Sequence, residues 1–419
     1  IYGRALHNRS VANIMKSHRF VRQVERNEMS EFETHPVLMA LAKLDIAHVH
    51  IDLGKLTVKY MVQQAELGDA ALSVEAFVAK ELGYLVGDKT KPIDKPQDVV
   101  LYGFGRIGRL IARLLVERTS TGEVMRLRAI VVRPGKEGDL EKRASLFTSD
   151  SVHGAFQGTV RIDKENQCLI ANGNVIKVIY ANRPDEIDYT SYGVNDALII
   201  DNTGTWRDEA GLSQHLKCKG ASKVVLTAPG KSPLKNIVFG INHDQIKPED
   251  KIITAASCTT NAIAPVLKVI NDKYGIEHGH VETVHAYTND QNLIDNYHTG
   301  NRRGRSAALN MVLTETGAAK AVVKAVPELE GKLTGNAVRV PIPNVSMAIL
   351  SLHLTRPTSK EELNEFLRLI ALHSNLQNQI SYTQDPDAVS SDFVGSREAA
   401  IVDSTATIVQ GNNCVLYLW

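Results

Sequence analysis

Apolar residues recur at helical spacing in the first part of the chain. Residues 37–44 and 71–82 place Val, Leu, Ala and Phe three and four positions apart. This period puts the apolar side chains on one face of a helix. Residues 87–96 are rich in proline and charge, which is typical of a linker. We therefore expect residues 1–96 to form a mostly helical N-terminal extension that ends in a linker.

Short β-rich runs alternate with helical ones after the linker. The expected strands are 99–102, 127–132, 197–200, 223–227, 237–240 and 251–255, with a helix at 107–117. Alternating strands and helices indicate a mainly parallel, doubly wound sheet. From about residue 281 the strands become longer, as at 346–354, with a helix at 360–371. We expect an α/β Rossmann-type dinucleotide-binding domain at 97–257 and an α+β catalytic domain at 258–419.

The composition fits a globular protein of two or three domains. The 419 residues carry 48 Lys and Arg against 47 Asp and Glu, a net charge of +1. This balance gives no electrostatic reason to expect nucleic acid as a partner. No apolar run approaches the roughly 20 residues that span a bilayer, so we expect no membrane partner. Four scattered cysteines without a Cys-x-x-Cys pair favour a reducing, cytoplasmic compartment.

Two features of the extension have alternative interpretations. Residues 1–26 are basic, which is typical of either a solvated helix face or an organelle transit peptide, and the first is preferred. His48, His50 and Asp52 would share one face only if that segment were a strand. A surface or packing role is preferred for them, and no metal site is expected.

A glycine motif follows the first expected strand of the α/β domain and opens a helix. It runs Gly103, Phe, Gly105, Arg106, Ile107, Gly108. The first glycine permits a tight turn, the second lets a pyrophosphate approach the backbone, and the third lets helix and strand pack closely. The helix N-terminus then presents its positive end to the phosphates. We expect a dinucleotide to bind here.

The end of the second strand bears on the choice of dinucleotide. NAD-binding versions of this fold usually have an acid there, which accepts hydrogen bonds from the adenosine ribose. Here the strand ends at Arg133, whose guanidinium could pair with a 2′-phosphate. The cofactor is NAD or NADP, with NADP favoured. The alternative is that Arg133 is solvated and Glu137 or Asp139 accepts the ribose hydroxyls.

Cys258 carries the sharpest chemical signal in the sequence. It follows an expected buried strand and opens a helix among polar residues. A thiol at a helix N-terminus has a lowered pKa, because the dipole and free N–H groups stabilise the thiolate. A thiolate nucleophile also needs a base, and His285 at the end of a later strand is the candidate.

Basic and hydroxyl residues further along suggest an anion site. Alone, the basic loop at 296–305 is typical of a solvated face. Together these residues could supply charge-assisted donors to phosphate oxygens. They are Arg302, Arg303, Arg305, Thr288, Thr316 and Arg339.

From about residue 99 to residue 419 the chain resembles phosphorylating glyceraldehyde-3-phosphate dehydrogenase. Six motifs in order carry the resemblance: Tyr-Gly-Phe-Gly-Arg-Ile-Gly-Arg at 102–109, Asp-Ser-Val-His-Gly at 150–154, Ser-Cys-Thr-Thr-Asn at 257–261, Thr-Val-His-Ala-Tyr-Thr at 283–288, Thr-Gly-Ala-Ala-Lys-Ala at 316–321 and Arg-Val-Pro-Ile-Pro-Asn-Val-Ser at 339–346.

The resemblance implies a reaction and a set of contacts. Cys258 would attack the aldehyde to give a thiohemiacetal, His285 would take its proton, and inorganic phosphate would cleave the resulting thioester. Thr288, Arg339 and nearby Asp290 would hold the substrate's phosphate. The attacking phosphate would meet Ser257, Thr259, Thr316, Gly317 and Arg303. The dinucleotide would contact Thr203, Gly204 and Thr227 as well as the glycine motif.

The resemblance also implies a homotetramer in glycolysis or gluconeogenesis. Three departures stand out: Arg133 replaces the family's second-strand acid, the extension is additional, and the sequence ends before an expected segment that carries an asparagine for the nicotinamide. The fragment is therefore expected to be impaired. The alternatives are erythrose-4-phosphate dehydrogenase and a non-catalytic binding or regulatory protein, and the partner of the extension is unknown.

Overall fold

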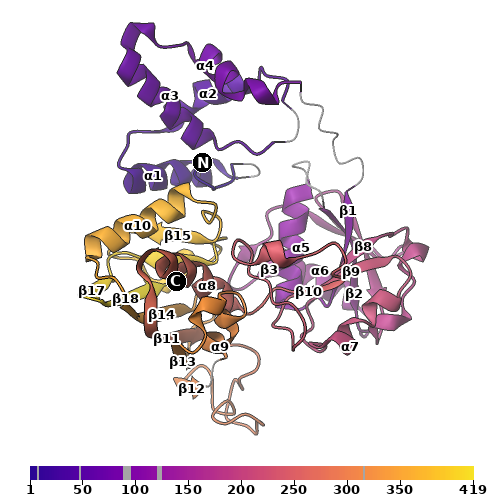
Figure 1. The fold of residues 1–419 in the computed structure, drawn as a ribbon. Coiled ribbons are helices and arrows are strands. Elements are labelled where there is room, and N and C mark those ends of the chain that lie inside the picture. Colours follow the sequence, from indigo (N-terminus) through magenta and orange to yellow (C-terminus); the bar gives the residue numbers. More distant parts are fainter. Residues whose placement is uncertain (7–8, 47–48, 88–95, 120–124, 315–316) are drawn as a thin grey trace. The chain divides into compact units, whose positions relative to one another are not determined.

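The computed structural model describes residues 1–6, 9–46, 49–87, 96–119, 125–314 and 317–419 (Figure 1). These residues fall into two compact units. The first comprises Ile1–Pro96 with Leu372–Gln377, and the second comprises Gln97–Ala371 with Asn378–Trp419. Most of the predicted linker, residues 88–95, lies outside the described residues. No helix in the described part of the chain is both long enough and apolar enough to cross a membrane.

The first unit is mostly helical, as predicted. Its elements are α1 (Val11–Glu25), α2 (Glu31–Leu41), α3 (Leu53–Leu67), η1 (Gly68–Ala70), α4 (Val74–Leu82) and η2 (Gly83–Leu85). Side-chain oxygens cap each α-helix, and at α2 Ser30 and Glu33 form a reciprocal capping box. Helix α2 packs against α3 and α4, and buries Val37 while α4 buries Phe77. The apolar side chains at helical spacing thus form a small core.

The segment around the two extension histidines is not a strand where it is described. Residues 49–52 have no regular secondary structure, and His48 lies outside the described residues. The Asp52 carboxylate accepts hydrogen bonds from the backbone N–H groups of Tyr2 and Gly3, each at 2.9 Å, and of Lys55 at 3.1 Å. Asp52 therefore caps α3 and fastens the start of the chain to it.

The first sheet of the second unit has the doubly wound strand order. Within the described residues that order is β10-β9-β8-β1-β2-β7-β6-β5. The strands from β10 to β7 are parallel, and β6 and β5 continue antiparallel. Their bounds are β1 (Gln97–Tyr102), β2 (Met125–Val132), β5 (Val160–Asp163), β6 (Cys168–Ala171), β7 (Asn174–Tyr180), β8 (Ala197–Asp201), β9 (Ala221–Leu226) and β10 (Ile252–Thr254). The predicted Rossmann-type fold is confirmed.

Strand β1 is buried on both faces, which explains its continuous apolar run. Val99 and Leu101 pack into a core with α5 (Arg106–Arg118) and α6 (Asp139–Thr148). Val100 and Tyr102 face a second core on the opposite side. Helix α7 and the other short elements between these strands complete the domain. They are β3 (Ser149–Asp150), β4 (Gly154–Ala155), η4 (Pro184–Glu186), η5 (Tyr189–Tyr192), α7 (Glu209–Leu212), η6 (His215–Lys217) and η7 (His243–Gln245).

The strand predicted at 237–240 is wrong. The neighbouring Asn236 forms only an isolated bridge with Thr254. The Asn242 side chain accepts the N–H of Val238 at 2.8 Å and donates to the Asn236 carbonyl at 3.1 Å. These bonds take backbone groups that a strand would use, so the apolar run folds as a turn instead. The antiparallel ribbon β5–β7 was not predicted.

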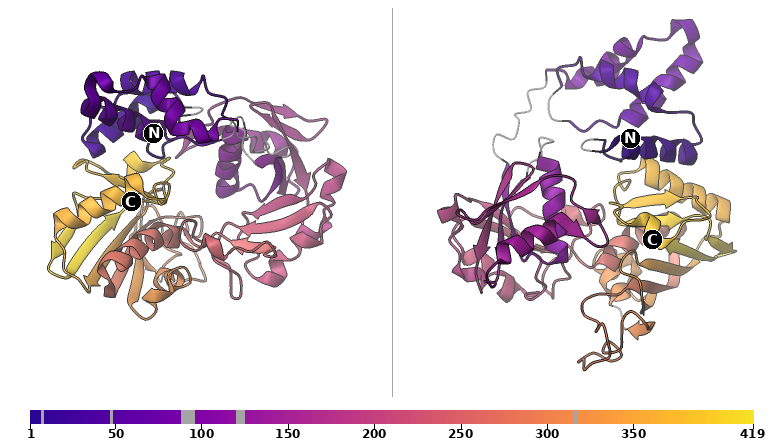
Figure 2. Two further views of the ribbon diagram at one scale, coloured as in Figure 1. Left: turned by 45° about the horizontal axis from the view of Figure 1, so that its top comes forward. Right: turned by 180° about the vertical axis from the view of Figure 1, so that it is seen from behind.

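The second sheet is mixed, as an α+β domain requires. Within the described residues its order is β12-β13-β11-β14-β18-β16-β15, with β17 beside β18. Its strands are β11 (Ile276–Ala286), β12 (Val312–Thr314), β13 (Leu333–Val340), β14 (Met347–Leu354), β15 (Ile380–Thr383), β16 (Ala400–Asp403), β17 (Ile408–Gln410) and β18 (Asn413–Leu418). Its helices are α8 (Cys258–Tyr274), α9 (Ala318–Val323), η8 (Pro327–Leu329), α10 (Lys360–His373) and η9 (Ser390–Phe393). The strands can be followed from orange to yellow in Figure 2.

Helix α8 joins the two sheets in the chain. It begins directly after β10, the last strand of the first sheet, and packs on β11, β14, β15 and β16 of the second. Its buried residues include Ile263, Val266, Leu267 and Ile270, which recur three and four positions apart. The domain boundary that we place between residues 257 and 258 falls at this junction and stays a prediction.

Candidate active site

A tight turn presents Cys258 at the first residue of α8. Ala256, just before it, has a φ of 55°, which is uncommon for a non-glycine residue. Ser257 is the N-cap, and its hydroxyl accepts the Thr260 N–H at 3.0 Å. The Asn261 side chain donates to the carbonyls of Ala255 at 2.7 Å and Ser257 at 2.9 Å. The turn is thus held from both sides, which fits a strained conformation kept for function.

The structure brings Cys258 and His285 together. The Sγ atom of Cys258 lies 3.8 Å from Nε2 of His285, which is near the end of β11. The hydrogen bond between Cys258 and His285 lowers the pKa of the Cys258 thiol. Desolvation opposes this, whereas the charge of His285 and hydrogen bonds from Thr259 reinforce it. Among the free cysteines in the described part of the chain, Cys258 is exposed and the others are buried.

The other ring nitrogen of His285 indicates its tautomer. Nδ1 lies 2.6 Å from the Ala286 carbonyl oxygen, which can only accept a hydrogen bond. Arg339 Nη1, a donor, lies 3.3 Å from the same nitrogen, so it is the shorter contact to the carbonyl that assigns the proton to Nδ1. In a neutral ring with this tautomer the Nε2 lone pair faces Cys258. This is the form that can take a proton from the thiol.

Arg339 lies beside His285 on the neighbouring strand. The two residues are register partners of β13 and β11. Arg339 Nη1 is 3.3 Å from the Ala286 carbonyl and 3.4 Å from Thr288 Oγ1. Its Nε atom is buried and has no hydrogen-bond partner. Burial lowers the pKa of the guanidinium, but arginine stays protonated at neutral pH. A charged group with a buried unpaired N–H is suited to bind an anion.

Asp290 and Arg303 contact each other. Arg303 Nη1 donates to Asp290 Oδ2 at 2.7 Å, and this bond lowers the pKa of the Asp290 carboxyl. His298 Nδ1 accepts the Gly300 N–H at 2.8 Å, so its Nε2 proton faces Asp290 Oδ1 at 3.6 Å. Arg303 is thus neutralised by a carboxylate in this arrangement. Arg305 likewise pairs with Asp295, at 2.7 Å, and Arg302 has a φ of 64°.

The remaining residues of the expected phosphate sites are distributed as follows. The Ser257 hydroxyl is 2.6 Å from that of Thr260, and Thr259 hydrogen-bonds toward Cys258. Gly317 is the N-cap of α9. Thr316 lies outside the described residues.

The glycine motif forms a close-packed turn with an open position. Gly103 has a φ of 96°, where a side chain would be strained. A Cβ on Gly108 would lie 2.3 Å from the Gly103 carbonyl oxygen. A Cβ on Gly105, the N-cap of α5, would meet nothing within 4 Å. The first and third glycines therefore serve packing, and the second leaves space at the helix N-terminus.

The unsatisfied groups around this turn fit a dinucleotide. Arg106 follows Gly105 at the first residue of α5, and its Nη2 is buried without a partner. Asn202 Oδ1 is also buried without a partner. Its Nδ2 donates to the Ile200 carbonyl at 3.0 Å. A pyrophosphate at the helix N-terminus would supply an acceptor oxygen for the Arg106 N–H, whereas the Asn202 oxygen needs a donor from another group. Ile107 is exposed beside it.

Asp201 organises the neighbouring loops and was missed by the sequence analysis. It is fully buried at the end of β8. Its Oδ1 accepts both the N–H and the hydroxyl of Thr203, at 2.8 and 2.7 Å, and its carbonyl accepts both groups of Thr227, at 3.0 and 3.1 Å. His215 Nε2 lies 3.0 Å from Oδ2. The available signal was an acid that directly follows a buried strand. Gly204, with a φ of 65°, completes the turn.

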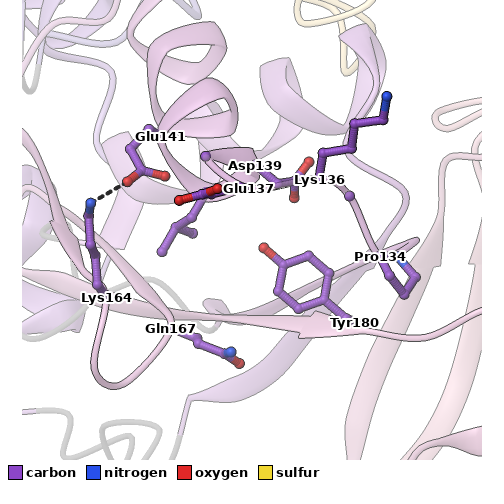
Figure 3. A pocket seen from close by; sticks show the side chains of 11 residues that line it. Pro134, Lys136, Glu137, Asp139, Glu141, Lys164, Gln167 and Tyr180 are labelled. Carbon is purple, nitrogen blue, oxygen red and sulfur yellow. Dashed lines mark ion pairs between the residues drawn. The ribbon is translucent and has the colours of Figure 1, made fainter.

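A polar pocket of about 490 Å³ opens beside the end of β2 (Figure 3). Arg133 is exposed at the end of that strand. Asp139 lines the pocket and binds Arg143 Nε at 2.6 Å. Burial and hydrogen bonding to Asp139 raise the pKa of the Tyr180 hydroxyl. Asp139 is therefore already paired, and Glu137 also lines the pocket (Figure 3).

The fold and the site are those of a dinucleotide-dependent oxidoreductase in which an exposed cysteine lies beside a histidine. Comparison with known proteins agrees with this class. Residues 97–209 match the NAD binding domain of glyceraldehyde 3-phosphate dehydrogenase, and residues 257–419 match its C-terminal domain. The chain belongs to the glyceraldehyde-3-phosphate dehydrogenase family.

Individual relatives differ in how much of the chain they match. A glyceraldehyde-3-phosphate dehydrogenase-like protein of Pseudomonas aeruginosa strain UCBPP-PA14 is 59% identical over 100% of this chain and 90% of its own length. A glyceraldehyde-3-phosphate dehydrogenase of Pseudomonas aeruginosa strain PAO1 is 41% identical over 77% of this chain and 92% of its own. The chloroplastic glyceraldehyde-3-phosphate dehydrogenase A of Zea mays is 38% identical, over 83% of each chain. The similarity to the first relative therefore includes the extension.

Proposed function

We propose that this protein oxidises glyceraldehyde 3-phosphate to 1,3-bisphosphoglycerate with NAD or NADP and inorganic phosphate. The observation that carries the proposal is the pairing of an exposed, acidified thiol with the imidazole of His285 beside Arg339. A thiolate provides a nucleophile for an aldehyde, and the adjacent guanidinium provides a charge for a phosphate.

His285 Nε2 takes the thiol proton, and the Cys258 sulfur forms a bond to the aldehyde carbon. The oxyanion that develops meets the backbone N–H groups at the start of α8. His285 returns its proton to that oxyanion, which gives the thiohemiacetal hydroxyl, and takes the proton back when the carbon loses its hydride. A nicotinamide dinucleotide bound at the glycine motif would supply the acceptor for the hydride of that carbon. The product on the protein is a thioester.

Inorganic phosphate completes the reaction. One of its oxygens attacks the thioester carbon, the carbon–sulfur bond breaks, and the Cys258 thiolate leaves. The product is an acyl phosphate. Arg339 and Thr288 are proposed to bind the phosphate of the substrate, with Asp290 nearby. The attacking phosphate is assigned to Ser257, Thr259, Thr316, Gly317 and Arg303. Arg303 must then exchange its bond with Asp290 for one with the phosphate, and two charged acceptors compete for it.

We propose that NADP is the preferred cofactor. Arg133 is exposed at the strand end where an acid would bind the ribose hydroxyls of NAD. Asp139, one alternative acceptor, is engaged by Arg143. The dinucleotide is assigned to the glycine motif with Arg106 and Ile107, and to Thr203, Gly204 and Thr227.

We also propose a cytoplasmic homotetramer. The free state of the described cysteines supports the compartment. Large apolar side chains are exposed on and around the basic loop, which favours burial against another copy. They are Leu293 (75% exposed), Ile294 (74%), Tyr297 (85%), Leu309 (83%) and Met311 (76%).

Steady-state kinetics of the purified full-length protein test the function. Glyceraldehyde 3-phosphate and erythrose 4-phosphate are each assayed with NAD and with NADP, in the presence and absence of inorganic phosphate. The proposal expects phosphate-dependent turnover with the first aldehyde. Faster, phosphate-independent turnover of erythrose 4-phosphate would establish the hydrolytic alternative. No turnover of either aldehyde would contradict the enzymatic proposal.

A further inference from the structure

Two arginines of helix α5 contact the small hairpin that β3 and β4 form. Arg109 Nη2 lies 3.7 Å from Asp150 Oδ2 in β3. Arg113 donates to the carbonyls of Phe147 at 2.9 Å and Gly154 at 3.0 Å. The hairpin of β3 and β4 is therefore fixed to the helix whose N-terminus faces the expected pyrophosphate.

Asp150 and His153 form the tip of this hairpin. Burial acts to raise the pKa of Asp150, but bonds from the N–H groups of His153 and Val152 outweigh it and hold the pKa at about 2. The Asp150 Oδ1 atom accepts both of these N–H groups and also lies 3.3 Å from His153 Nδ1. Asp150 is therefore an anion that orders the turn.

His153 extends this contact to the second sheet. Its Nε2 lies 3.3 Å from Asn344 Nδ2, which can only donate. Nε2 must then accept, so Nδ1 carries the proton and donates to Asp150. Asn344 belongs to the loop between β13 and β14. The neutral ring thus joins an anion fixed on α5 to a loop of the other sheet.

That loop leads directly to the proposed base. Val345 has a φ of 61°, a costly conformation for a β-branched residue. The next residue, Ser346, accepts the Ala286 N–H at 3.1 Å with its hydroxyl. The Ala286 carbonyl in turn accepts from His285 and Arg339. A shift of the loop would move the group that orients both side chains.

A second contact fastens the other end of α5. Arg397, in the segment before β16, lies 2.6 Å from Glu117 near the C-terminal end of the helix. Helix α5 is thus linked to the second domain directly at Glu117, and through the hairpin and His153 at Arg109 and Arg113. A ligand that fixes α5 would restrain the loop of Asn344 through these ties.

We propose that His153 and Asn344 are positioning residues that couple dinucleotide binding at α5 to anion binding at Arg339. The inference rests on the proposed function, because the anion site and the dinucleotide site are those assigned there. Binding of one ligand favours the loop position that the other requires, and this coupling must be equal in both directions.

Ligand binding to the full-length protein tests the coupling. The Kd of the reduced dinucleotide is measured by fluorescence with and without saturating glycerol 3-phosphate, a phosphate monoester that presents the kind of anion assigned to Arg339, and the ratio is the coupling factor. We expect a factor of about fivefold or more in the parent protein. His153→Ala and Asn344→Ala should each reduce it to less than about twofold and lower kcat, while the Kd of each ligand alone changes little.

A double-mutant cycle separates coupling from general destabilisation. The combined variant should lose no more coupling than either single variant, because each substitution removes the same contact between His153 and Asn344. His153→Gln keeps an acceptor and a donor and should restore part of the coupling. His278→Ala, on the exposed part of β11, is the matched control and should leave the factor unchanged. Thermal unfolding verifies that each variant is folded.

The outcomes distinguish this inference from the proposed function. A parent protein that binds neither ligand and turns over no aldehyde would refute the function. A parent protein that binds both ligands, with variants that retain the full coupling factor, would refute the inference alone. Strictly additive losses in the double variant would also refute it.

Discussion

Replacing His285 with leucine is expected to slow the reaction of Cys258 with iodoacetamide near neutral pH. The thiolate is the reactive form, and the hydrogen bond and charge of His285 favour it. Leucine removes both the hydrogen bond and the charge, and it fills a volume similar to that of histidine. The pKa of the thiol therefore rises toward its ordinary range, and the curve of alkylation rate against pH moves to higher pH.

The separation of the two side chains bounds the size of this effect. Sγ and Nε2 are 3.8 Å apart. Two unit charges about 4 Å apart attract by about 1 kcal/mol in bulk water and about 4 kcal/mol at an effective dielectric constant of 20. Each 1.4 kcal/mol corresponds to a factor of about ten. The alkylation rate at neutral pH should thus fall between about fivefold and about a thousandfold, toward the lower end because Cys258 is exposed.

Comparison with His285→Gln separates the two roles of the imidazole. Glutamine can still donate a hydrogen bond to sulfur but cannot take a proton at neutral pH. Its alkylation rate should lie between those of the parent and the leucine variant. Its kcat should fall by about 10² to 10⁴, the usual contribution of a general base.

The assay follows the rate of iodoacetamide incorporation into the cofactor-free protein as a function of pH. His278→Leu is the matched control, because His278 is exposed on the same strand and stacks on His353. The control should react as the parent does. If the leucine variant at position 285 has an unchanged pH midpoint, the argument that His285 acidifies Cys258 is wrong.

Four further changes test the site and its support. Cys258→Ser should abolish turnover and spare dinucleotide binding, because a hydroxyl stays protonated at neutral pH; retained kcat would exclude the nucleophile. Gly108→Ala should destabilise the fold by about 1–3 kcal/mol through overpacking, whereas Gly105→Ala should cost less than about 1 kcal/mol but weaken dinucleotide binding. Urea unfolding measures the stability of each variant, and titration measures its dinucleotide affinity. Equal stability losses in the two variants would contradict the geometry. Arg133→Asp should shift the NADP/NAD ratio of kcat/KM toward NAD, and an unchanged ratio would remove Arg133 from the cofactor site. Asp150 has a pKa of about 2, below the ordinary carboxyl value, so its stabilisation is present at neutral pH and is lost as the pH falls toward 2; Asp150→Asn should flatten the stability profile between about pH 4 and pH 2, and an unaltered acid profile would refute the assignment.

Local sequence patterns were sufficient for features that depend on neighbouring residues. The glycine motif predicted the turn into α5, and the helical period predicted the extension. The apolar run at 237–240 was misleading, because a side-chain amide from Asn242 took the backbone N–H that a strand would need. Propensity describes what a segment favours alone, whereas a competing hydrogen bond depends on the surrounding fold.

The candidate site shows the same difference between local features, which the sequence predicted, and tertiary contacts, which it did not. Cys258 was recognisable because a helix start is a local feature, and that helix end lowers a thiol pKa wherever it occurs. The role of the buried Asp201 was not recognisable from the sequence, because its partners Thr203 and Thr227 belong to turns after two different strands. The ion pair of Asp290 with Arg303 was also not predicted, although both residues had been assigned to phosphate sites.

The sequence by itself determined the fold class and the family, and it indicated the candidate nucleophile and the candidate base. These depend on period, on motif order and on residues whose chemistry is fixed by their position in one element. The tertiary structure decided the tautomer of His285, the unpaired Nε of Arg339, and the contact of His153 with Asn344. The physical reason is that hydrogen bonds and charge pairs act over a few ångströms, and only the folded chain brings strands so distant in sequence within that range.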